Sequence, residues 1–126
     1  MLTDKGAEMP KNALVVKADL TTELLDIADN ELRKLQGAVD GLIQPVDIDT
    51  ITMYVNEEGL LRSDLSPNYI ATILMAELGY HTTIMGDVVF TGAPDEEGET
   101  TELDQTSIVE LTELATQARE LLGALA

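Results

Sequence analysis

Apolar and polar residues alternate in short runs along the chain, a pattern that predicts strands. The predicted strands span residues 13–18, 42–46, 51–55 and 86–91. The strand at 13–18 is expected to bury one face, and the nearly continuous apolar run at 86–91 predicts a central position. Pro45 restricts the 42–46 strand to a sheet edge or a strand end, because proline cannot donate to the ladder.

Two further segments concern how the chain continues after a predicted strand. Residues 23–27 either return as the second strand of a hairpin with 13–18 or continue as a helix. Asn56 to Gly59 has Asn first and Gly fourth, which a type I turn favours. We expect Leu60 and Leu61 to begin a returning strand after that turn.

Helical spacing of apolar residues marks two internal helices. The first begins after the N-cap candidates Asp29 and Asn30 and ends at Asp40-Gly41. The second begins at Ser66-Pro67, where serine caps the free amides and proline occupies the first turn, and ends at Gly79. The expected buried stripes are Leu32, Leu35 and Val39 in the first helix and Ile70, Ile73, Leu74 and Leu78 in the second.

A longer helix closes the chain, opened by a capping box of Ser107 and Glu110. Its apolar stripe is Ile108, Leu111, Ala115, Ala118, Leu122 and Leu125, widened by Leu114 and Leu121. Docking on the protein's own sheet is favoured over a dimer seam, since the repeat is too short for a coiled coil.

These elements predict an α+β fold, with a small, mainly antiparallel sheet, two helices packed on it and a longer C-terminal helix. The expected organisation is a flexible arm over 1–12, an α+β domain over 13–103 and the amphipathic helix over 104–126. Residues 93–104 carry six acids and no base, so we expect a mobile, solvated loop there.

Composition narrows the class of protein. A chain of 126 residues that is 44% hydrophobic has enough material for one core. The absence of cysteine excludes disulfides, thiolate zinc sites and a cysteine nucleophile. No apolar run approaches the roughly 20 residues of a membrane span, and the start lacks signal-peptide order, so a cytoplasmic protein is expected.

Net charge is the least ordinary property: 24 acidic against 7 basic residues give −17. Direct binding to nucleic acid or to an anionic membrane would oppose that field. Aromatic content of 3% also argues against a base-stacking surface. A basic protein surface is the natural partner, and the alternative is that the charge serves solubility or adaptation to high salt.

Candidate chemistry is sparse. His81 is the only histidine, and no nucleophile-elbow, P-loop or dinucleotide motif occurs. Asp47, Asp49 and the acids of 95–99 do not match a calcium-binding loop. We therefore expect no catalytic residue, no metal and no cofactor, and a protein that is not an enzyme.

Several segments resemble a known family, namely ALVVKA, LRKLQGAVDGLIQPV, MYVNEEGLL, SPNYIAT and GDVVFTG in this order. From Ala13 to about Leu103 the chain is similar to domain of unknown function 3846, found in small proteins of bacteriophages and mobile elements. The resemblance implies a phage-type accessory protein with an α+β fold, located in an infected bacterial host, and no catalytic activity carries over from it.

Three functions remain open. The favoured one is a binding module with an acidic face for a basic host or phage protein, such as a DNA mimic or host-factor inhibitor. That face would comprise Glu57, Glu58, Asp95, Glu96, Glu97, Glu99 and Glu102. A small-ligand-binding or sequestering protein would use Arg62, Asn68, Tyr69 and His81, although Asn68 could equally cap a helix and Arg62 could pair with Asp64. A virion or assembly component could form a homodimer through Ile108, Leu111, Leu122 and Leu125.

Overall fold

The computed structural model describes residues 9–125, and for Leu125 only the backbone. One five-stranded sheet has the order β2-β1-β5-β4-β3, with every pairing antiparallel. The strands are β1 Asn12–Val16, β2 Thr22–Asp26, β3 Ile43–Ile48, β4 Ile51–Asn56 and β5 Val88–Gly92. The helices are α1 Glu31–Val39, α2 Tyr69–Glu77 and α3 Gln105–Leu125, and a 3₁₀ turn, η2, spans Gly59–Leu61. The predicted α+β class is confirmed.

The strand predictions agree with the sheet. Residues 22–26 pair with β1 as a hairpin, so the helical alternative for this segment is wrong. The apolar strand β5 is central, between β1 and β4, and Pro45 lies on the edge strand β3. Most of the predicted arm, residues 1–8, lies outside the described residues.

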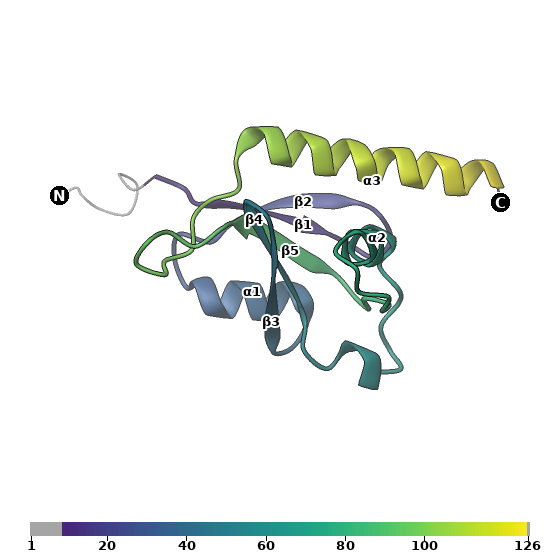
Figure 1. Cartoon of the computed structure of the whole chain (residues 1–126), viewed down its shortest axis with the longest axis horizontal. Helices are drawn as coiled ribbons and strands as arrows, with labels where there is room; N and C mark the ends of the chain where they lie inside the picture. Colours follow the sequence, from purple (N-terminus) through teal and green to yellow (C-terminus); the bar gives the residue numbers. More distant parts are fainter. Residues whose placement is uncertain (1–8, 126) are drawn as a thin grey trace.

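Helices cover both faces of the sheet, with α1 and α3 on opposite sides (Figure 1). Leu14 and Val16 of β1 pack into the core shared with α2 and α3, whereas Ala13 and Val15 pack toward α1. The prediction of a single buried face for 13–18 is therefore wrong, because both faces of this strand are covered. Phe90 and Val89 of β5 divide between the two cores in the same way.

Helix α2 begins later than its sequence suggests. Its N-cap is Asn68, whose side chain accepts a hydrogen bond from the backbone N–H of Ala71, so the predicted Ser66 cap is wrong. Pro67 instead forms a bridge with Met85. The buried residues of α2 are Ile70, Ala71 and Met75, while the expected stripe members Ile73 and Leu78 are exposed. In α1, Leu35 and Val39 are buried as expected, but Leu32 is exposed.

Leu60 and Leu61 do not begin a strand. They form η2, because both neighbours of β4 are already provided by β3 and β5. After η2 the chain leaves the sheet and continues to α2, and the short turn low in Figure 1 shows this path.

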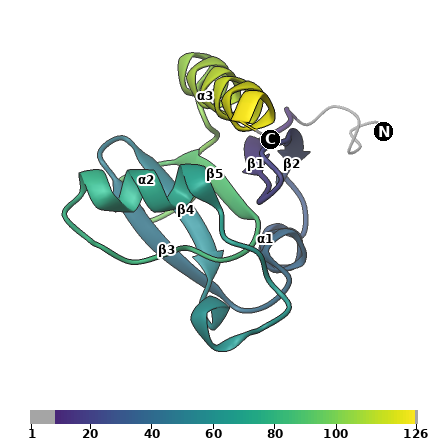
Figure 2. The same cartoon turned by 90° about the vertical axis from the view of Figure 1, so that its right-hand side faces the viewer.

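Helix α3 starts at Gln105, earlier than the predicted capping box. The Asp104 carboxylate accepts a hydrogen bond from the backbone N–H of Ser107 at 3.1 Å, so Asp104 provides the cap. Leu111 and Ala115 are buried, with Ile108 and Ala118 partly buried, which confirms docking on the protein's own core. The distal residue Leu122 is exposed, and the side chain of Leu125 lies outside the described residues. Figure 2 shows α3 lying along β1 and β2.

Candidate functional site

The two acidic segments lie at opposite ends of the sheet. Ile51 of β4 pairs with Gly92 of β5, so the loop after Gly92 lies beside the start of β4. Glu57 and Glu58 follow the other end of this strand, and a six-residue strand separates the segments by about 17 Å. The seven predicted acids therefore do not form one face (Figure 1).

A different set of acids gathers beside the start of β4. The turn between β3 and β4 is tied to the following loop by a hydrogen bond from Ala93 N to the Thr50 carbonyl oxygen, at 3.1 Å. This contact places two aspartates of the hairpin and the acids of the 93–104 loop at the same end of the sheet. We call this set the acidic end, and all its members are exposed: Asp47, Asp49, Asp95, Glu96, Glu97 and Glu99. Sequence reasoning missed the contribution of the hairpin.

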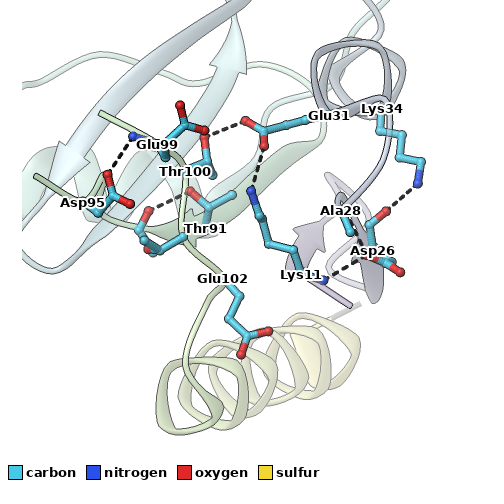
Figure 3. Close-up of polar contacts among 12 residues, drawn as sticks. Lys11, Asp26, Ala28, Glu31, Lys34, Thr91, Asp95, Glu99, Thr100 and Glu102 are labelled. Carbon is cyan, nitrogen blue, oxygen red and sulfur yellow. Dashed lines mark hydrogen bonds and ion pairs between the residues drawn. The ribbon is translucent and has the colours of Figure 1, made fainter. Parts of the chain in front are cut away.

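Asp95 organises the loop of the acidic end. Its Oδ1 accepts hydrogen bonds from the backbone N–H groups of Glu97 and Glu99, each at 2.9 Å. Figure 3 shows the bond from Glu99. Asp95 N also donates to the Glu99 carbonyl oxygen at 2.9 Å, which closes the turn. Gly98 has φ +83°, a conformation that suits glycine. The carboxylates of Glu96, Glu97 and Glu99 thus extend from a defined turn.

The loop beyond the acidic end packs against the domain. Thr101 bridges to Gly92, and Leu103 is buried and donates its backbone N–H to the Asn12 carbonyl oxygen at 2.8 Å. Residues 94–99 are exposed, as expected of a solvated loop. The expectation that the whole 93–104 segment stays unpacked is wrong from Thr100 onward, and Glu102 is exposed within this packed part.

Basic side chains are bound elsewhere in the described part of the chain. Lys11 pairs with Glu31 at 3.3 Å, and the second carboxylate oxygen of Glu31 accepts a 2.6 Å hydrogen bond from Thr100 (Figure 3). Lys17 pairs with Glu23 at 3.1 Å. Among residues 9–125, no ion pair involves a member of the acidic end.

Arg62 is engaged by two aspartates. Its Nε and Nη2 donate to both carboxylate oxygens of Asp64, at 3.0 and 2.6 Å, and Nη2 also contacts Asp40 Oδ2 at 2.8 Å. Its Nη1 donates to the Asp40 carbonyl oxygen at 2.6 Å. Hydrogen bonding to Asp64 raises the pKa of Arg62, and the same contact lowers the pKa of Asp64. Arg62 therefore pairs with Asp64, which was the predicted alternative to binding an anionic ligand.

The predicted ligand-binding residues do not converge. Asn68 is 0% exposed, and its Nδ2 donates to the carbonyl oxygens of Val16 and Gly86 at 3.0 and 2.9 Å. With the helix cap, these bonds occupy both the amide nitrogen and the amide oxygen of the buried Asn68 side chain. Tyr69 and His81, in contrast, are exposed. The arrangement makes Asn68 a structural residue that joins α2 to β1.

Two hollows lie near the helices. A cleft of about 400 Å³ between α1 and the β1–β2 hairpin is lined by Lys17 and Lys34, but Lys17 pairs with Glu23 and Lys34 donates to the Asp26 carbonyl oxygen at 2.7 Å. A second hollow of about 210 Å³ lies at η2, against the edge of the sheet. We call it the η2 groove, and its lining includes Val46, Val55, Glu57, Glu58, Leu60, Leu61, Met75 and Met85.

Within residues 9–125, histidine and carboxylate side chains do not gather in groups of three or more suited to a metal ion. None of the helices in that range is both long and apolar enough to cross a bilayer.

Fold and surface together define a small α+β domain, an antiparallel sheet covered by helices, with carboxylates at one end that form no ion pair within residues 9–125. A family model described as Domain of unknown function (DUF3846) matches residues 10–116, and the chain belongs to this family. The predicted resemblance is thus confirmed, and the match continues past Leu103 into α3. The searches of curated proteins and of solved structures found no match.

Proposed function

We propose that this protein is a non-enzymatic binding module whose acidic end docks on a basic surface of another protein. The supporting observation is that six exposed carboxylates, from the β3–β4 hairpin and the 93–104 loop, share one end of the sheet, and none of them has an ion pair within residues 9–125. Unpaired carboxylates attract a basic partner and accelerate its association.

The closed turn at Asp95 favours binding of this kind. Four hydrogen bonds of Asp95, two through its side chain and two through its backbone, limit the number of loop conformations before a partner arrives. A surface that is already ordered loses less conformational entropy on association. The overall charge of −17 adds a long-range attraction that weakens as salt increases.

The partner class follows from the same chemistry. Exposed carboxylates can take the place of DNA phosphates on a basic protein, and the proposed partner is therefore a basic host or phage protein, including one that binds DNA. In that setting the protein acts as a phage-encoded accessory factor in the bacterial cytoplasm, as a DNA mimic or an inhibitor of a host factor.

The test maps where a basic probe binds. An oligolysine peptide is titrated into the ¹⁵N-labelled full chain at low salt and followed by amide chemical shifts. We expect saturable shifts at residues 47–50 and 95–99, which disappear on adding salt. Shifts spread evenly over the acids of α2 and α3, with none concentrated at the acidic end, would contradict the proposal.

A second candidate function is that of an assembly component. Leu121 of α3 is 63% exposed and its neighbour Leu122 37%, beyond the part of the helix that is buried. Self-association through this surface predicts a dimer in sedimentation velocity that Leu121→Lys converts to a monomer. A monomer at all concentrations would remove this candidate.

A further inference from the structure

The η2 groove lies at the other end of β4 from the acidic end. It opens between the strands β3 and β4, represented by Val46 and Val55, and the loop before β5, represented by Met85. Met75 at the end of α2 closes the hollow on the helix side, and η2 itself forms the rim. The groove is therefore a separate surface with a mainly apolar interior.

Two adjacent leucines stand exposed on this rim. Leu60 is 68% exposed and Leu61 is 86% exposed. Gly59, just before them, lies close to the loop that precedes β5, since a Cβ at this position would lie 3.3 Å from the backbone oxygen of Met85 and would require a shift of a few tenths of an ångström. Paired apolar side chains beside a hollow are typical of an interaction surface, in contrast to a single exposed leucine.

Hydrogen bonds of Asn56 hold the turn in place. Its Oδ1 accepts from Glu58 N at 2.8 Å, and its Nδ2 donates to the carbonyl oxygens of Val39 and Asp40 at 3.0 and 3.2 Å. Asn56 is buried, so these bonds connect the end of β4 to the end of α1. The rim is consequently formed before any partner binds.

Carboxylates complete the rim. Glu57 and Glu58 line the groove and take part in none of the ion pairs among residues 9–125. Arg62 follows closely in sequence but is held by Asp40 and Asp64. An apolar interior with an unneutralised acidic rim is complementary to an apolar side chain flanked by cations.

The size of the groove limits what it can hold. Sites for small molecules and cofactors occupy about 300–1,000 Å³, more than the approximately 210 Å³ available here. A single anchor side chain fits such a space, and one buried anchor often dominates the affinity of a protein interface.

We propose that the η2 groove binds a short peptide segment of a protein partner, with a leucine or methionine side chain in the groove and a neighbouring lysine or arginine at Glu57 and Glu58. The inference rests on the proposed function in taking the partner to be basic, but it assigns a different surface and adds the apolar anchor.

The test uses three capped peptides with the ¹⁵N-labelled full chain: Gly-Lys-Leu-Lys-Gly, Gly-Lys-Gly-Lys-Gly and Gly-Glu-Leu-Glu-Gly. The first is expected to shift the amides of 57–61 and 82–85 saturably. Removing the leucine is expected to weaken binding about tenfold, because the buried apolar area is lost. The acidic peptide is expected to leave these amides unshifted.

Matched variants separate this proposal from the proposed function. Glu57→Gln with Glu58→Gln, and separately Leu60→Ser with Leu61→Ser, should each weaken the Lys-Leu-Lys peptide at least about fivefold, through lost ion pairs and lost apolar contact. Glu96→Gln with Glu97→Gln should leave its affinity unchanged while weakening oligolysine at the acidic end. These are surface substitutions, and unaltered amide spectra elsewhere verify the fold.

Opposite results would overturn the inference. Equal affinity for the peptides with and without leucine, or shifts confined to 95–99, would show that the η2 groove takes no anchor. This outcome leaves the acidic end untouched, since oligolysine reports on that surface independently. Binding at 57–61 with no oligolysine shift at 95–99 would instead reject the acidic end and retain the groove.

Discussion

Replacing Asn68 with alanine removes a side chain that joins three parts of the fold. The cap to Ala71 N contributes about 1 kcal/mol to stability. The carbonyl oxygens of Val16 and Gly86 lose a buried donor, at roughly 1–2 kcal/mol each. The expected loss in the free energy of unfolding is therefore about 3–5 kcal/mol, a large part of the 5–15 kcal/mol typical of a domain.

Urea unfolding followed by circular dichroism measures this loss, and Ser66→Ala provides the matched control. Sequence alone points to Ser66 as the cap, whereas the structure assigns that role to Asn68. The control is expected to change the free energy of unfolding by less than about 0.5 kcal/mol. Equal losses in the two variants, or a loss below about 1 kcal/mol for Asn68→Ala, would refute the role given to Asn68.

Three further predictions concern stability. Gly92→Ala places a Cβ 2.5 Å from the backbone oxygen of Glu102, so the free energy of unfolding should fall by about 1–3 kcal/mol in urea titrations. Gly37→Ala in α1 meets no atom within 4 Å and should raise it by about 0.5–1 kcal/mol, as an increase in urea midpoint with unchanged slope. Hydrogen bonds to the side chains of Arg62 and Ser107 lower the pKa of Asp64 and Asp104 respectively. The two carboxylates therefore stabilise the fold above their unfolded pKa near 3.8, and this stabilisation is lost as the pH falls through their lower pKa values in the folded protein. Asp104→Asn should accordingly make the melting temperature fall less steeply with decreasing pH in the acid range.

Much of the sheet could be predicted because its strands carry their own pattern. The alternation in 51–55 predicts a strand, and the structure has β4 there. The apolar run before Gly92 predicts a central strand, and β5 is buried along its whole length. Pro45 could be placed at an edge for the same kind of local reason. Burial of both faces of β1 could not be predicted, since it depends on where α1 packs.

The start of α2 shows where local information ends. Ser66 and Asn68 are both good N-cap residues by type. The choice is made by carbonyl oxygens of Val16 and Gly86, which lie 52 and 18 residues away in sequence and meet the Asn68 amide only in the folded chain. Similarly, the turn at Asn56 could be predicted, but the strand expected at Leu60 failed because β3 and β5 already occupy both sides of β4.

The sequence predicted which acidic residues are exposed, but it did not predict how they are arranged in space. Counting residues revealed the surplus of acids, and the segments Glu57-Glu58 and 95–99 are indeed exposed. Their separation is decided by the pairing of Ile51 with Gly92. The same pairing places the start of the 93–104 loop against the β3–β4 turn, so Asp47 and Asp49 lie at the same end of the sheet as the loop acids.

Comparison of two variants with equal net charge tests most directly whether binding depends on this arrangement. One carries Asp47→Asn, Glu96→Gln, Glu97→Gln and Glu99→Gln, which keeps Asp95 to hold the loop. The other neutralises four exposed helical acids, Glu77, Glu110, Glu113 and Glu120, to glutamine. Each loses four negative charges, so both move from −17 to −13.

The measurement is the dissociation constant of oligolysine for each variant and for the unsubstituted chain, by isothermal titration calorimetry at low salt. Loss of four exposed ion pairs at about 0.4 kcal/mol each predicts roughly tenfold weaker binding for the acidic-end variant and a change below about twofold for the helical variant. Equal weakening of both would show that total charge governs the interaction and would contradict a binding surface at the acidic end.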